Sequence, residues 1–463
     1  MSEAADTPDR LDPLVWRTVA VVVLGPLMTQ MDATIVGVSL SSIGQALHAP
    51  IVTVQWVIGG YLLALALMLP LNGWLVDRFG AKTLYLTCFS AFTLASLLCG
   101  AARSIDGLIA ARLLQGLSGG LLAPMAQMMV ARVAGRHMAR VIGFMAMPVL
   151  LAPILGPSIA GLIVAHAGWR WLFYVNLPLG LLGLVLAALL LPRDAPAAER
   201  RRFDALGFLL ISPALVSLLY GLDRAQQPPG LLCLAAGVLL MTGFVLHALR
   251  SKDRALVDVR LFGNRIFRSA TVALFLSNGV AFAGQMLLPL FLIVGWRFSP
   301  SQAGWTLAAQ GLGMLCVYPA TGSLTARFGC RPVSAGGALL GVLATLPMVW
   351  MSLGGFSMAL MTGALFLRGA AQGAIGVPAL SASYAAVPRE TIPLATTASN
   401  IAQRLGGPIA TTVLALLVAA GQAAHPGSGP RAFTLPLLAM LALQSVLFCV
   451  ASTLPMRIPH SPR

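Results

Sequence analysis

The stretch Gly73-Trp-Leu-Val-Asp-Arg-Phe-Gly80 lies between two apolar segments and returns later in the chain as Gly322-Ser-Leu-Thr-Ala-Arg-Phe-Gly329. Five of the eight positions are identical. A weaker similarity relates two later segments. Arg112, Gln115 and Gly116 of the first resemble Arg368, Gln372 and Gly373 of the second. Repetition over such a distance indicates two related halves, each built from several structural elements.

Apolar segments of about 20 residues recur along the whole chain, each long enough to cross a bilayer as a helix. The composition agrees, since 58% of the 463 residues are hydrophobic and only 10% are charged. A soluble domain carries roughly 25% charged residues. We therefore predict an all-α integral membrane protein with fourteen transmembrane helices: 15–40, 52–76, 82–102, 106–130, 139–165, 170–191, 204–222, 231–249, 269–295, 302–325, 332–353, 357–385, 393–420 and 432–454.

The position of the repeat divides these helices into two six-helix bundles with two extra helices between them. The first copy follows helix 2, and the second follows helix 10, two helices later than two bundles alone would place it. Two such bundles form a transporter architecture with its binding site at their interface. The predicted parts are a tail (1–14), the first bundle (15–192), a loop (193–203), two inserted helices (204–249), a basic linker (250–268), the second bundle (269–455) and a tail (456–463).

The basic residues orient the predicted helices in the membrane. An even number of helices places both termini on one side, and the loops, tails and helix ends on that side hold 22 of the 30 lysines and arginines. The opposite loops hold five, and three lie within helices. Because positive charge marks the cytoplasmic side, we predict that both tails, the 193–203 loop and the 250–268 linker are cytoplasmic. The same bias accounts for the net charge of +16 without nucleic acid as a partner.

The remaining residue types favour no catalytic, cofactor or metal centre. The six cysteines lack the paired spacing of metal ligands, and all six histidines lie at or beyond predicted helix ends. The predicted helices hold no Ser/His or Cys/His arrangement, no HExxH pattern and no pair of carboxylates. We therefore expect a protein that is not an enzyme and that binds no cofactor or metal. A receptor or sensor is also disfavoured, since the predicted loops are too short for a signalling domain.

Further motifs complete a pattern typical of one family. They are Met31-Asp-Ala-Thr-Ile-Val-Gly-Val-Ser39 in helix 1, Arg112-Leu-Leu-Gln-Gly116 in helix 4, Trp169-Arg-Trp-Leu-Phe-Tyr-Val-Asn-Leu-Pro178 at helix 6, and Gly143, Pro148, Pro153, Gly156, Pro157 and Gly161 in helix 5. With the stretch from Gly73 to Lys82, they resemble the major facilitator superfamily, specifically its fourteen-span drug:proton antiporters (the EmrB/QacA-like group), and look closest to the MdtD-type members. Gly37 departs from the asparagine that is usual in this group.

Asp32 is the only one of fourteen acidic residues that lies well inside a predicted helix. An ionisable group at that depth is costly and therefore indicates function. At 1.5 Å per residue, Asp32 and Arg112 lie roughly 12 Å and 9 Å from the outer ends of their helices, so the two can interact. We interpret Asp32 as the proton carrier and Arg112 as its partner, because desolvation favours the neutral acid and a cation favours the carboxylate. The alternative is a structural ion pair between helices 1 and 4.

The repeated stretch predicts a gate at the cytoplasmic ends of the bundles. Gly73 and Gly80 allow a tight turn between helices. Asp77, beside Arg78, would meet a basic side chain or a helix N-terminus of the other half. The second copy keeps Arg327 but has alanine in place of the acid, so this latch would be asymmetric. The alternative is a solvated loop that only sets the topology.

Helix 5 carries glycines and prolines that allow close packing and bending. The family resemblance implies an exporter-like motif formed by five of them: Gly143, Pro153, Gly156, Pro157 and Gly161. Ordinary helix packing is the alternative interpretation.

Two more arginines, Arg368 and Arg404, lie within helices 12 and 13, so arginines inside helices outnumber acids three to one. They would hold anionic or zwitterionic substrates through bidentate contacts. Snorkelling, or hydrogen bonds to backbone carbonyls, is the alternative. Other residues expected to line an adaptable cavity are polar, flexible or aromatic: Gln30, Met31, Gln115, Phe282, Gln285 and Gln310. Helical packing is the alternative interpretation for these residues.

These observations predict proton-coupled efflux of small amphipathic compounds across the bacterial inner membrane, by alternating access of two bundles in a functional monomer. The expected partners are a small-molecule substrate, protons and the lipid bilayer. A carrier of the same fold for an organic anion or another metabolite is the alternative, and the surplus of arginines favours it.

Overall fold

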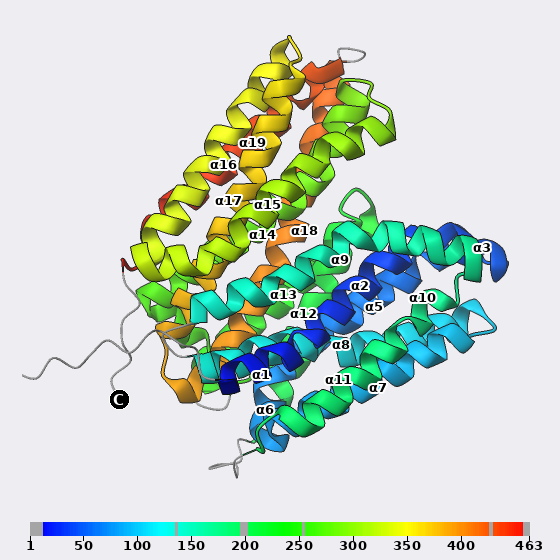
Figure 1. The fold of residues 1–463 in the computed structure, drawn as a ribbon, viewed down its shortest axis with the longest axis vertical. Helices are drawn as coiled ribbons and strands as arrows, with labels where there is room; N and C mark the ends of the chain where they lie inside the picture. Colours follow the sequence, from blue (N-terminus) through cyan, green and yellow to red (C-terminus); the bar gives the residue numbers. More distant parts are fainter. Residues whose placement is uncertain (1–12, 135–137, 195–201, 252–254, 426–428, 457–463) are drawn as a thin grey trace, which may run out of the picture.

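The computed structural model describes residues 13–134, 138–194, 202–251, 255–425 and 429–456. In this part of the chain the secondary structure is helical, without a strand (Figure 1). Apolar segments become helices in a membrane because hydrocarbon offers no hydrogen-bond partner, so each backbone group must be satisfied within its own segment. The all-α class predicted from the sequence is confirmed.

The first bundle contains the helices up to α11. The first two predicted spans are each broken into consecutive shorter pieces, whereas the third, fourth and fifth are single helices. The elements are α1 (Pro13–Val22), α2 (Leu24–Val38), α3 (Leu40–Ala46), α4 (Ile51–Val54), α5 (Trp56–Met68), η1 (Leu69–Leu71), α6 (Asn72–Phe79), α7 (Ala81–Ala101), α8 (Ile105–Ala134), α9 (Met138–Ala167), α10 (Trp171–Tyr174) and α11 (Asn176–Leu190).

Two inserted helices and the second bundle complete the chain. The inserted helices are α12 (Ala205–Asp223) and α13 (Pro228–Ser251). The second bundle follows a short turn, and its elements are η4 (Val259–Gly263), α14 (Arg265–Leu290), η5 (Phe291–Gly295), α15 (Pro300–Phe328), α16 (Cys330–Leu353), α17 (Met358–Ala385), η6 (Arg389–Thr391), α18 (Ile392–Ala424), η7 (Gly429–Phe433) and α19 (Thr434–Ala451).

Twelve segments of the described chain are long and apolar enough to cross a membrane by length and composition. The two other predicted spans, 139–165 and 302–325, correspond to α9 and α15, helices of 30 and 29 residues. At 1.5 Å per residue each is roughly 45 Å long, which exceeds the hydrocarbon core of a bilayer. The protein is thus a multi-pass membrane protein, and all fourteen predicted spans correspond to helical segments.

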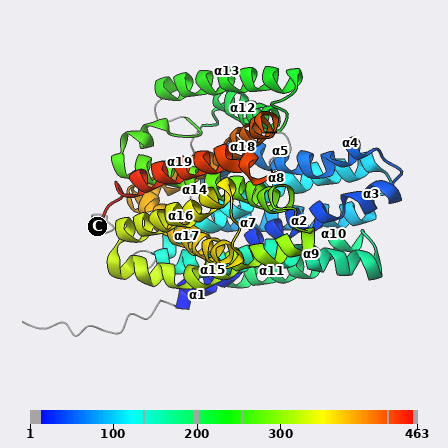
Figure 2. The ribbon, with the colours of Figure 1, turned by 90° about the horizontal axis from the view of Figure 1, so that it is seen from above.

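The inserted pair lies against one side of the molecule and touches both bundles. The Ser212 hydroxyl of α12 donates to the Leu67 carbonyl oxygen of α5 (3.0 Å), and Thr412 of α18 donates to the Leu222 carbonyl oxygen of α12 (3.0 Å). Helix α13 packs on α12 and forms the outer edge of the molecule (Figure 2). The inserted pair therefore bridges α5 and α18 on one side of the bundle interface. It does not cover the opposite side.

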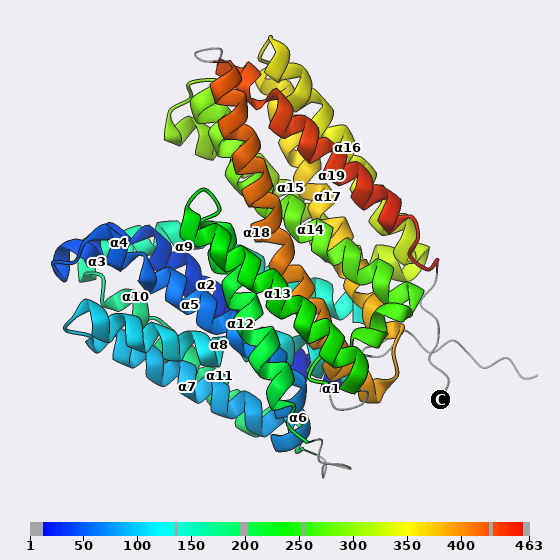
Figure 3. The same ribbon diagram turned by 180° about the vertical axis from the view of Figure 1, so that it is seen from behind.

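The two bundles meet at one end, the end where α1 begins and α19 ends. We call this the basal end and the opposite one the distal end. The bundles converge at the basal end and diverge toward the distal end, as the views from both sides show (Figures 1 and 3). Gln127 of α8 carries the hydrogen bonds described between the bundles: its amide oxygen accepts from Asn400 Nδ2 (2.9 Å) and the Tyr384 hydroxyl (3.3 Å). The structure is therefore closed at the basal end.

Candidate functional site

Asp32 and Arg112 form an ion pair inside the first bundle. Arg112 Nη1 donates to Asp32 Oδ2, which joins α2 to α8. Both side chains have no exposed surface. The pairing predicted from their depth along the helices is present, and the carboxylate is fully shielded from solvent.

Two amide side chains donate to the carboxylate, and a serine hydroxyl accepts from both of them. Asn176 Nδ2 and Gln115 Nε2 donate to Asp32 Oδ1 over 3.0 Å and 3.1 Å. The same two nitrogens donate to Ser96 Oγ over 3.1 Å and 2.7 Å. Gln115 also accepts from Arg112 Nη1 through its amide oxygen (2.7 Å). Helices α2, α7, α8 and α11 thus meet in one hydrogen-bonded cluster around the Asp32 side chain.

The arginine is held on its other side by α5. Arg112 Nε donates to the Val57 carbonyl oxygen (2.9 Å), and the guanidinium carbon lies 4.1 Å from the centre of the Tyr61 ring. The ring of Phe173 lies 5.8 Å from the same carbon. An aromatic face attracts a cation, most strongly where water is excluded. Arg112 Nη2 has no partner among the described residues.

Sequence reasoning missed part of this cluster. Asn176 lies within the Trp169–Pro178 motif, but its role comes from contact with a residue 144 positions earlier. Ser96 and Tyr61 are common helix residues, and only packing distinguishes them. Gln115 was expected in the substrate cavity, whereas the structure buries it completely in the ion-pair cluster. Gln115 lies three residues after Arg112, and residues at this spacing are neighbours on a helix. This spacing was the sequence signal that could have placed Gln115 beside the ion pair.

The repeated stretch contains one turn glycine and one packing glycine. Gly80 has φ +85°, the left-handed conformation that favours glycine, and a β-carbon there would clash with Asp194. Gly73 instead lies within α6, so it does not form the turn expected of it. A β-carbon on Gly73 would lie 3.5 Å from the Pro393 carbonyl oxygen and from Leu394 of the second bundle. Its small size therefore serves the contact between α6 and α18.

The charged residues of the stretch lie at the surface of the basal end. Arg78 and Arg327 are exposed, and Arg327 stacks on Phe328 with 5.2 Å between the guanidinium carbon and the ring centre. Asp77 is half-buried, one helical turn beyond Gly73. The stretch thus borders the closed contact between the bundles.

The motif glycines of α9, the fifth predicted span, differ in their surroundings. Gly143 faces the second bundle, where a β-carbon would lie 3.3 Å from the Tyr318 carbonyl oxygen of α15. Gly156 faces α2, where a β-carbon would lie 2.7 Å from a Thr34 methyl group. Gly161 has no neighbour within 4 Å of that position. The side chains of Pro153 and Pro157 lie outside the described residues. Helix α9 therefore uses glycines to approach both α2 and α15.

The two remaining arginines occupy opposite environments. Arg404 on α18 is exposed, and it interacts electrostatically with Tyr61, the residue that stacks on Arg112. Arg368 is 1% exposed and lies inside the second bundle. Arg368 was expected to line the substrate cavity, but α17 directs it inward.

The other cavity candidates lie at or near the surface of their helices. Gln30 and Gln285 are exposed, Phe282 is 51% exposed, and Met31 is half-buried. Gln310 is half-buried and donates to Gln372 Oε1 across α15 and α17 (3.2 Å). These residues are accessible, in contrast to Gln115 and Arg368.

Helix packing also corrects which residues correspond in the weaker sequence similarity between the halves. Tyr61 and Gln310 stand at matching places, each 12 residues before its copy of the repeated stretch. A β-carbon on Gly116 would clash with the Tyr61 carbonyl oxygen, and one on Gly369 would clash with the Gln310 carbonyl oxygen. Gly369 therefore occupies the place of Gly116. Arg368 then corresponds to Gln115, the residue before Gly116, and not to Arg112.

Comparison with known proteins agrees with this architecture. A profile described as Major Facilitator Superfamily matches residues 22–411. A "Multidrug resistance protein B homolog" of Mycobacterium tuberculosis is 35% identical over 431 residues, which cover 89% of this chain and 77% of that protein. A "Putative multidrug resistance protein MdtD" of Cronobacter sakazakii is 34% identical over 360 residues, covering 76% and 74% of the two chains.

Solved structures share the fold at low sequence identity. The human organic anion transporter MFSD10 (TETRAN) superposes with a TM-score of 0.65 at 19% identity, covering 95% of this chain and 100% of that one. The proton:xylose symporter XylE superposes with a TM-score of 0.64 at 15% identity, covering 96% and 98%. The paired bundles, the buried ion pair and these matches together show that the chain belongs to the Major Facilitator Superfamily of membrane transporters.

Proposed function

We propose that this transporter exports small amphipathic compounds in exchange for protons. The observation that carries the proposal is the Asp32 carboxylate inside the first bundle, which is held by Arg112, Gln115 and Asn176 and has no exposed surface. The relatives named as multidrug resistance proteins support amphipathic drugs as the substrate class.

The ion pair supplies a means of coupling. A proton on Asp32 removes the negative partner of Arg112 and leaves a buried cation unbalanced, which is strongly unfavourable. The bundle then gains by opening the pair, so protonation and movement of α2 against α8 are linked. A membrane potential supplies about 2.3 kcal/mol per charge per 100 mV, and each pH unit adds about 1.36 kcal/mol. One proton therefore suffices for a large outward gradient of a neutral compound.

We assign the basal end to the cytoplasm, because the basic residues concentrate there. Both tails are then cytoplasmic, and a closed basal end corresponds to a carrier whose substrate site faces outward. Residues 15–192 and 269–455 are the two moving bundles, and 204–249 is an insertion that follows α5 and α18. The contact of α6 with the start of α18 and the Gln127 hydrogen bonds form the cytoplasmic gate.

The test is transport in proteoliposomes with an imposed pH gradient, on the wild type and on Asp32→Asn. Asparagine keeps the shape of the side chain but cannot exchange a proton at neutral pH. We expect the variant to insert normally, to equilibrate substrate down its gradient and to lose accumulation against it. Uphill transport at the wild-type level would exclude Asp32 as the proton carrier.

A carrier for organic anions is a second candidate, and Arg404 favours it. This arginine is exposed on α18 and has no carboxylate partner among the described residues, while Asp32 is already paired. Arginine recognises carboxylates by paired hydrogen bonds. Competition assays with a cationic dye and with aromatic carboxylic acids separate the two candidates, and Arg404→Gln should weaken only the binding of acids.

A further inference from the structure

The hydrogen bonds described for the Asp32 carboxylate all come from N–H donors. Arg112 Nη1 donates to Oδ2, and Gln115 Nε2 and Asn176 Nδ2 donate to Oδ1 over 3.1 Å and 3.0 Å. This arrangement suits a carboxylate, which only accepts hydrogen bonds. A protonated carboxyl group is itself a donor, and a buried donor without an acceptor is costly. A proton on Asp32 therefore requires one of these partners to become an acceptor.

Gln115 is held in its present orientation by the oxygen of its amide. This oxygen accepts from Arg112 Nη1 (2.7 Å) and from the Cys99 thiol (3.5 Å). A half-turn of the amide would bring its nitrogen to the guanidinium, so that two donors would face each other. Arginine neither accepts hydrogen bonds nor loses its proton in a protein. Gln115 therefore remains a donor whether or not Asp32 carries a proton.

Asn176 contacts two groups that can both become its donors. Its Nδ2 lies 3.0 Å from Asp32 Oδ1 and 3.1 Å from Ser96 Oγ, and the residue is 1% exposed. The terminal torsion of asparagine is broad and roughly two-fold, so a half-turn exchanges the amide nitrogen and oxygen. The oxygen can then accept from a protonated Asp32 and from the Ser96 hydroxyl, which donates as well as accepts. Ser96 still accepts from Gln115 Nε2 (2.7 Å), so each hydrogen bond around Oδ1 is replaced.

We infer that Asn176 is the partner that responds to the transported proton: its amide reverses when a proton binds Asp32 Oδ1, and it changes from donor to acceptor. The step forms one O–H bond on Oδ1, with a proton from the solution that the carrier faces, and it breaks no covalent bond. Release of the proton restores the original orientation. The inference rests on the proposed proton exchange and adds the group that accepts the hydrogen bond of the proton.

The neighbouring ionisable groups do not replace Asp32 in this step. Those near it on the packed helices are Arg112 of α8, Tyr61 of α5, Cys99 of α7 and, beyond Tyr61, Arg404 of α18. Helices α9 and α11 also pack on α2; the sequence of α11 has no charged residue, and that of α9 has Arg140 and His166 near its ends. Arginine stays protonated, and tyrosine and cysteine ordinarily keep their protons at neutral pH.

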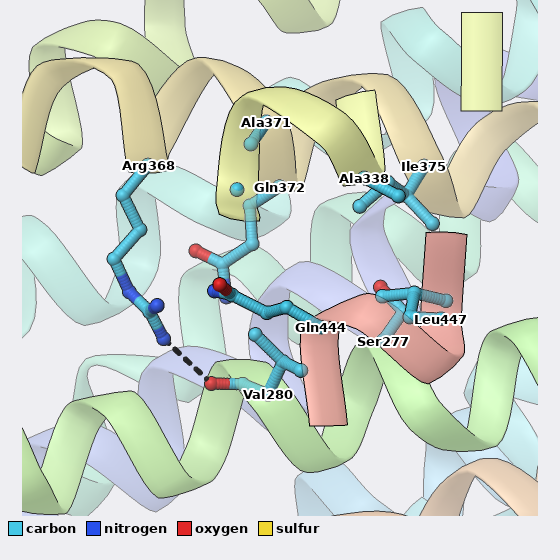
Figure 4. A pocket seen from close by; sticks show the side chains of 10 residues that line it. Ser277, Val280, Ala338, Arg368, Ala371, Gln372, Ile375, Gln444 and Leu447 are labelled. Atoms are coloured by element: carbon cyan, nitrogen blue, oxygen red, sulfur yellow. Dashed lines mark hydrogen bonds between the residues drawn. The ribbon is translucent and has the colours of Figure 1, made fainter. Parts of the chain in front are cut away.

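The described part of the second bundle does not repeat the cluster. Arg368 stands at the place of Gln115, and its Nη2 donates to the Val280 carbonyl oxygen of α14 (2.9 Å; Figure 4). A small cavity beside Arg368 is otherwise bordered by neutral residues. Glu390, exposed at the basal end, is the single acidic residue of the sequence from α14 to α19. The response to a proton therefore belongs to the first bundle.

The test is infrared difference spectroscopy of the purified full-length protein between alkaline and acidic buffer. One sample carries isotope-labelled aspartate, and another carries asparagine labelled in its side-chain amide. We expect a C=O band of protonated aspartic acid at low pH, together with a change in an asparagine amide band, and both should be lost in Asp32→Asn. The chain has five asparagines, so Asn176→Leu assigns the amide band. Leucine has a similar size but no hydrogen-bonding group, and it should remove the amide change.

Thr93→Val is the matched control. Thr93 lies on α7 against Gly180 of α11 and is 7% exposed, but its hydroxyl donates to the Phe89 carbonyl oxygen of its own helix (2.8 Å). Both bands should remain in this variant. Ser96→Ala covers the case in which Asn176→Leu does not fold. It removes one of the two donors to the reversed amide, so the asparagine band at low pH should change its frequency.

The outcomes separate this inference from the proposed function. An Asp32 acid band without an asparagine amide change in the wild type overturns the reversal of Asn176 and leaves the proton exchange intact. Absence of the Asp32 band overturns both. An amide change that persists unaltered in Asn176→Leu also overturns the inference, because another asparagine then produces it.

Discussion

At the scale of single residues, similar side chains have different roles because their backbone and neighbours differ. Gly80 and Gly161 both belong to family motifs, yet only Gly80 has a positive φ, and only Gly80 faces a close side chain, that of Asp194. Gly161 lies within α9, where no atom lies within 4 Å of a β-carbon position. The two glycines therefore respond to the same substitution in opposite directions.

Gly80→Ala should destabilise the protein, and Gly161→Ala should not. The backbone conformation of Gly80 (φ +85°, ψ 154°) is almost confined to glycine and costs an alanine about 1–3 kcal/mol, and displacement of Asp194 adds to that cost. Alanine at Gly161 should stabilise α9 by roughly 0.5–1 kcal/mol, since glycine in a helix loses more conformational entropy on folding. Thermal unfolding in detergent measures both variants. An unchanged Tm for Gly80→Ala would mean that this turn relaxes without cost.

At the scale of elements, α7 and α11 cap each other at the basal end. Asp194, beyond α11, accepts from the backbone nitrogens of Lys82 (2.8 Å) and Thr83 (3.0 Å) and from the Thr83 hydroxyl (2.9 Å). Lys82 Nζ in turn donates to the carbonyl oxygens of Ala188 (2.7 Å) and Leu191 (2.8 Å). Acidic side chains stabilise helix N-termini and basic side chains stabilise helix C-termini, because the free N–H and C=O groups there carry positive and negative partial charges.

The second bundle repeats the basic half of this arrangement. Arg331 stands at the position that matches Lys82, and its Nε donates to the Leu454 carbonyl oxygen at the end of α19 (2.6 Å). The repeat therefore extends beyond the eight-residue stretch to the residue that joins helices 3 and 6 of each bundle.

Asp194→Ala should lower stability, because the N-terminus of α7 then loses three hydrogen bonds. Loss of a helix cap costs about 0.5–2 kcal/mol, and we expect the upper part of that range. Arg193→Ala, at the exposed neighbouring residue, is the matched control and should leave the Tm unchanged. The prediction is contradicted if the two variants unfold at the same temperature.

At the scale of the whole molecule, Gln127 of the first bundle joins the two bundles at the basal end. Gln127 accepts from both Asn400 and Tyr384, so one side chain of the first bundle holds two helices of the second. These bonds must break when the basal end opens. Gln127 therefore stabilises the closed contact between the bundles at the basal end.

Gln127→Ala should shift the transporter toward the state with an open basal end. Each lost hydrogen bond contributes about 0.5–1.5 kcal/mol, so the closed state becomes several-fold less favoured. Hydrogen exchange followed by mass spectrometry should become faster at the basal ends of α8, α17 and α18, and remain unchanged at their distal ends. Gln45→Ala, at an exposed distal glutamine, is the control. Uniform exchange across both ends would instead indicate general destabilisation.

The membrane class, the helical segments, the repeat and the position of Asp32 well inside an apolar segment could all be predicted from the amino-acid sequence. Helix length and the exclusion of charge are local requirements of a bilayer, so one segment at a time reveals them. A single acid well inside fourteen apolar segments is equally visible without a structure. The depth of Asp32 and Arg112 along their helices was sufficient to pair them.

Which residues complete the site depends on the three-dimensional packing of the helices. Asn176, Ser96 and Tyr61 reach the ion pair from different helices, and no local pattern sets them apart from other helix residues. Arg368 and Arg404 look alike in the sequence, yet one is buried beside a cavity and the other is exposed. The physical reason is that the rotation and contacts of each helix are set by its neighbours in the bundle, and those neighbours lie up to hundreds of residues away.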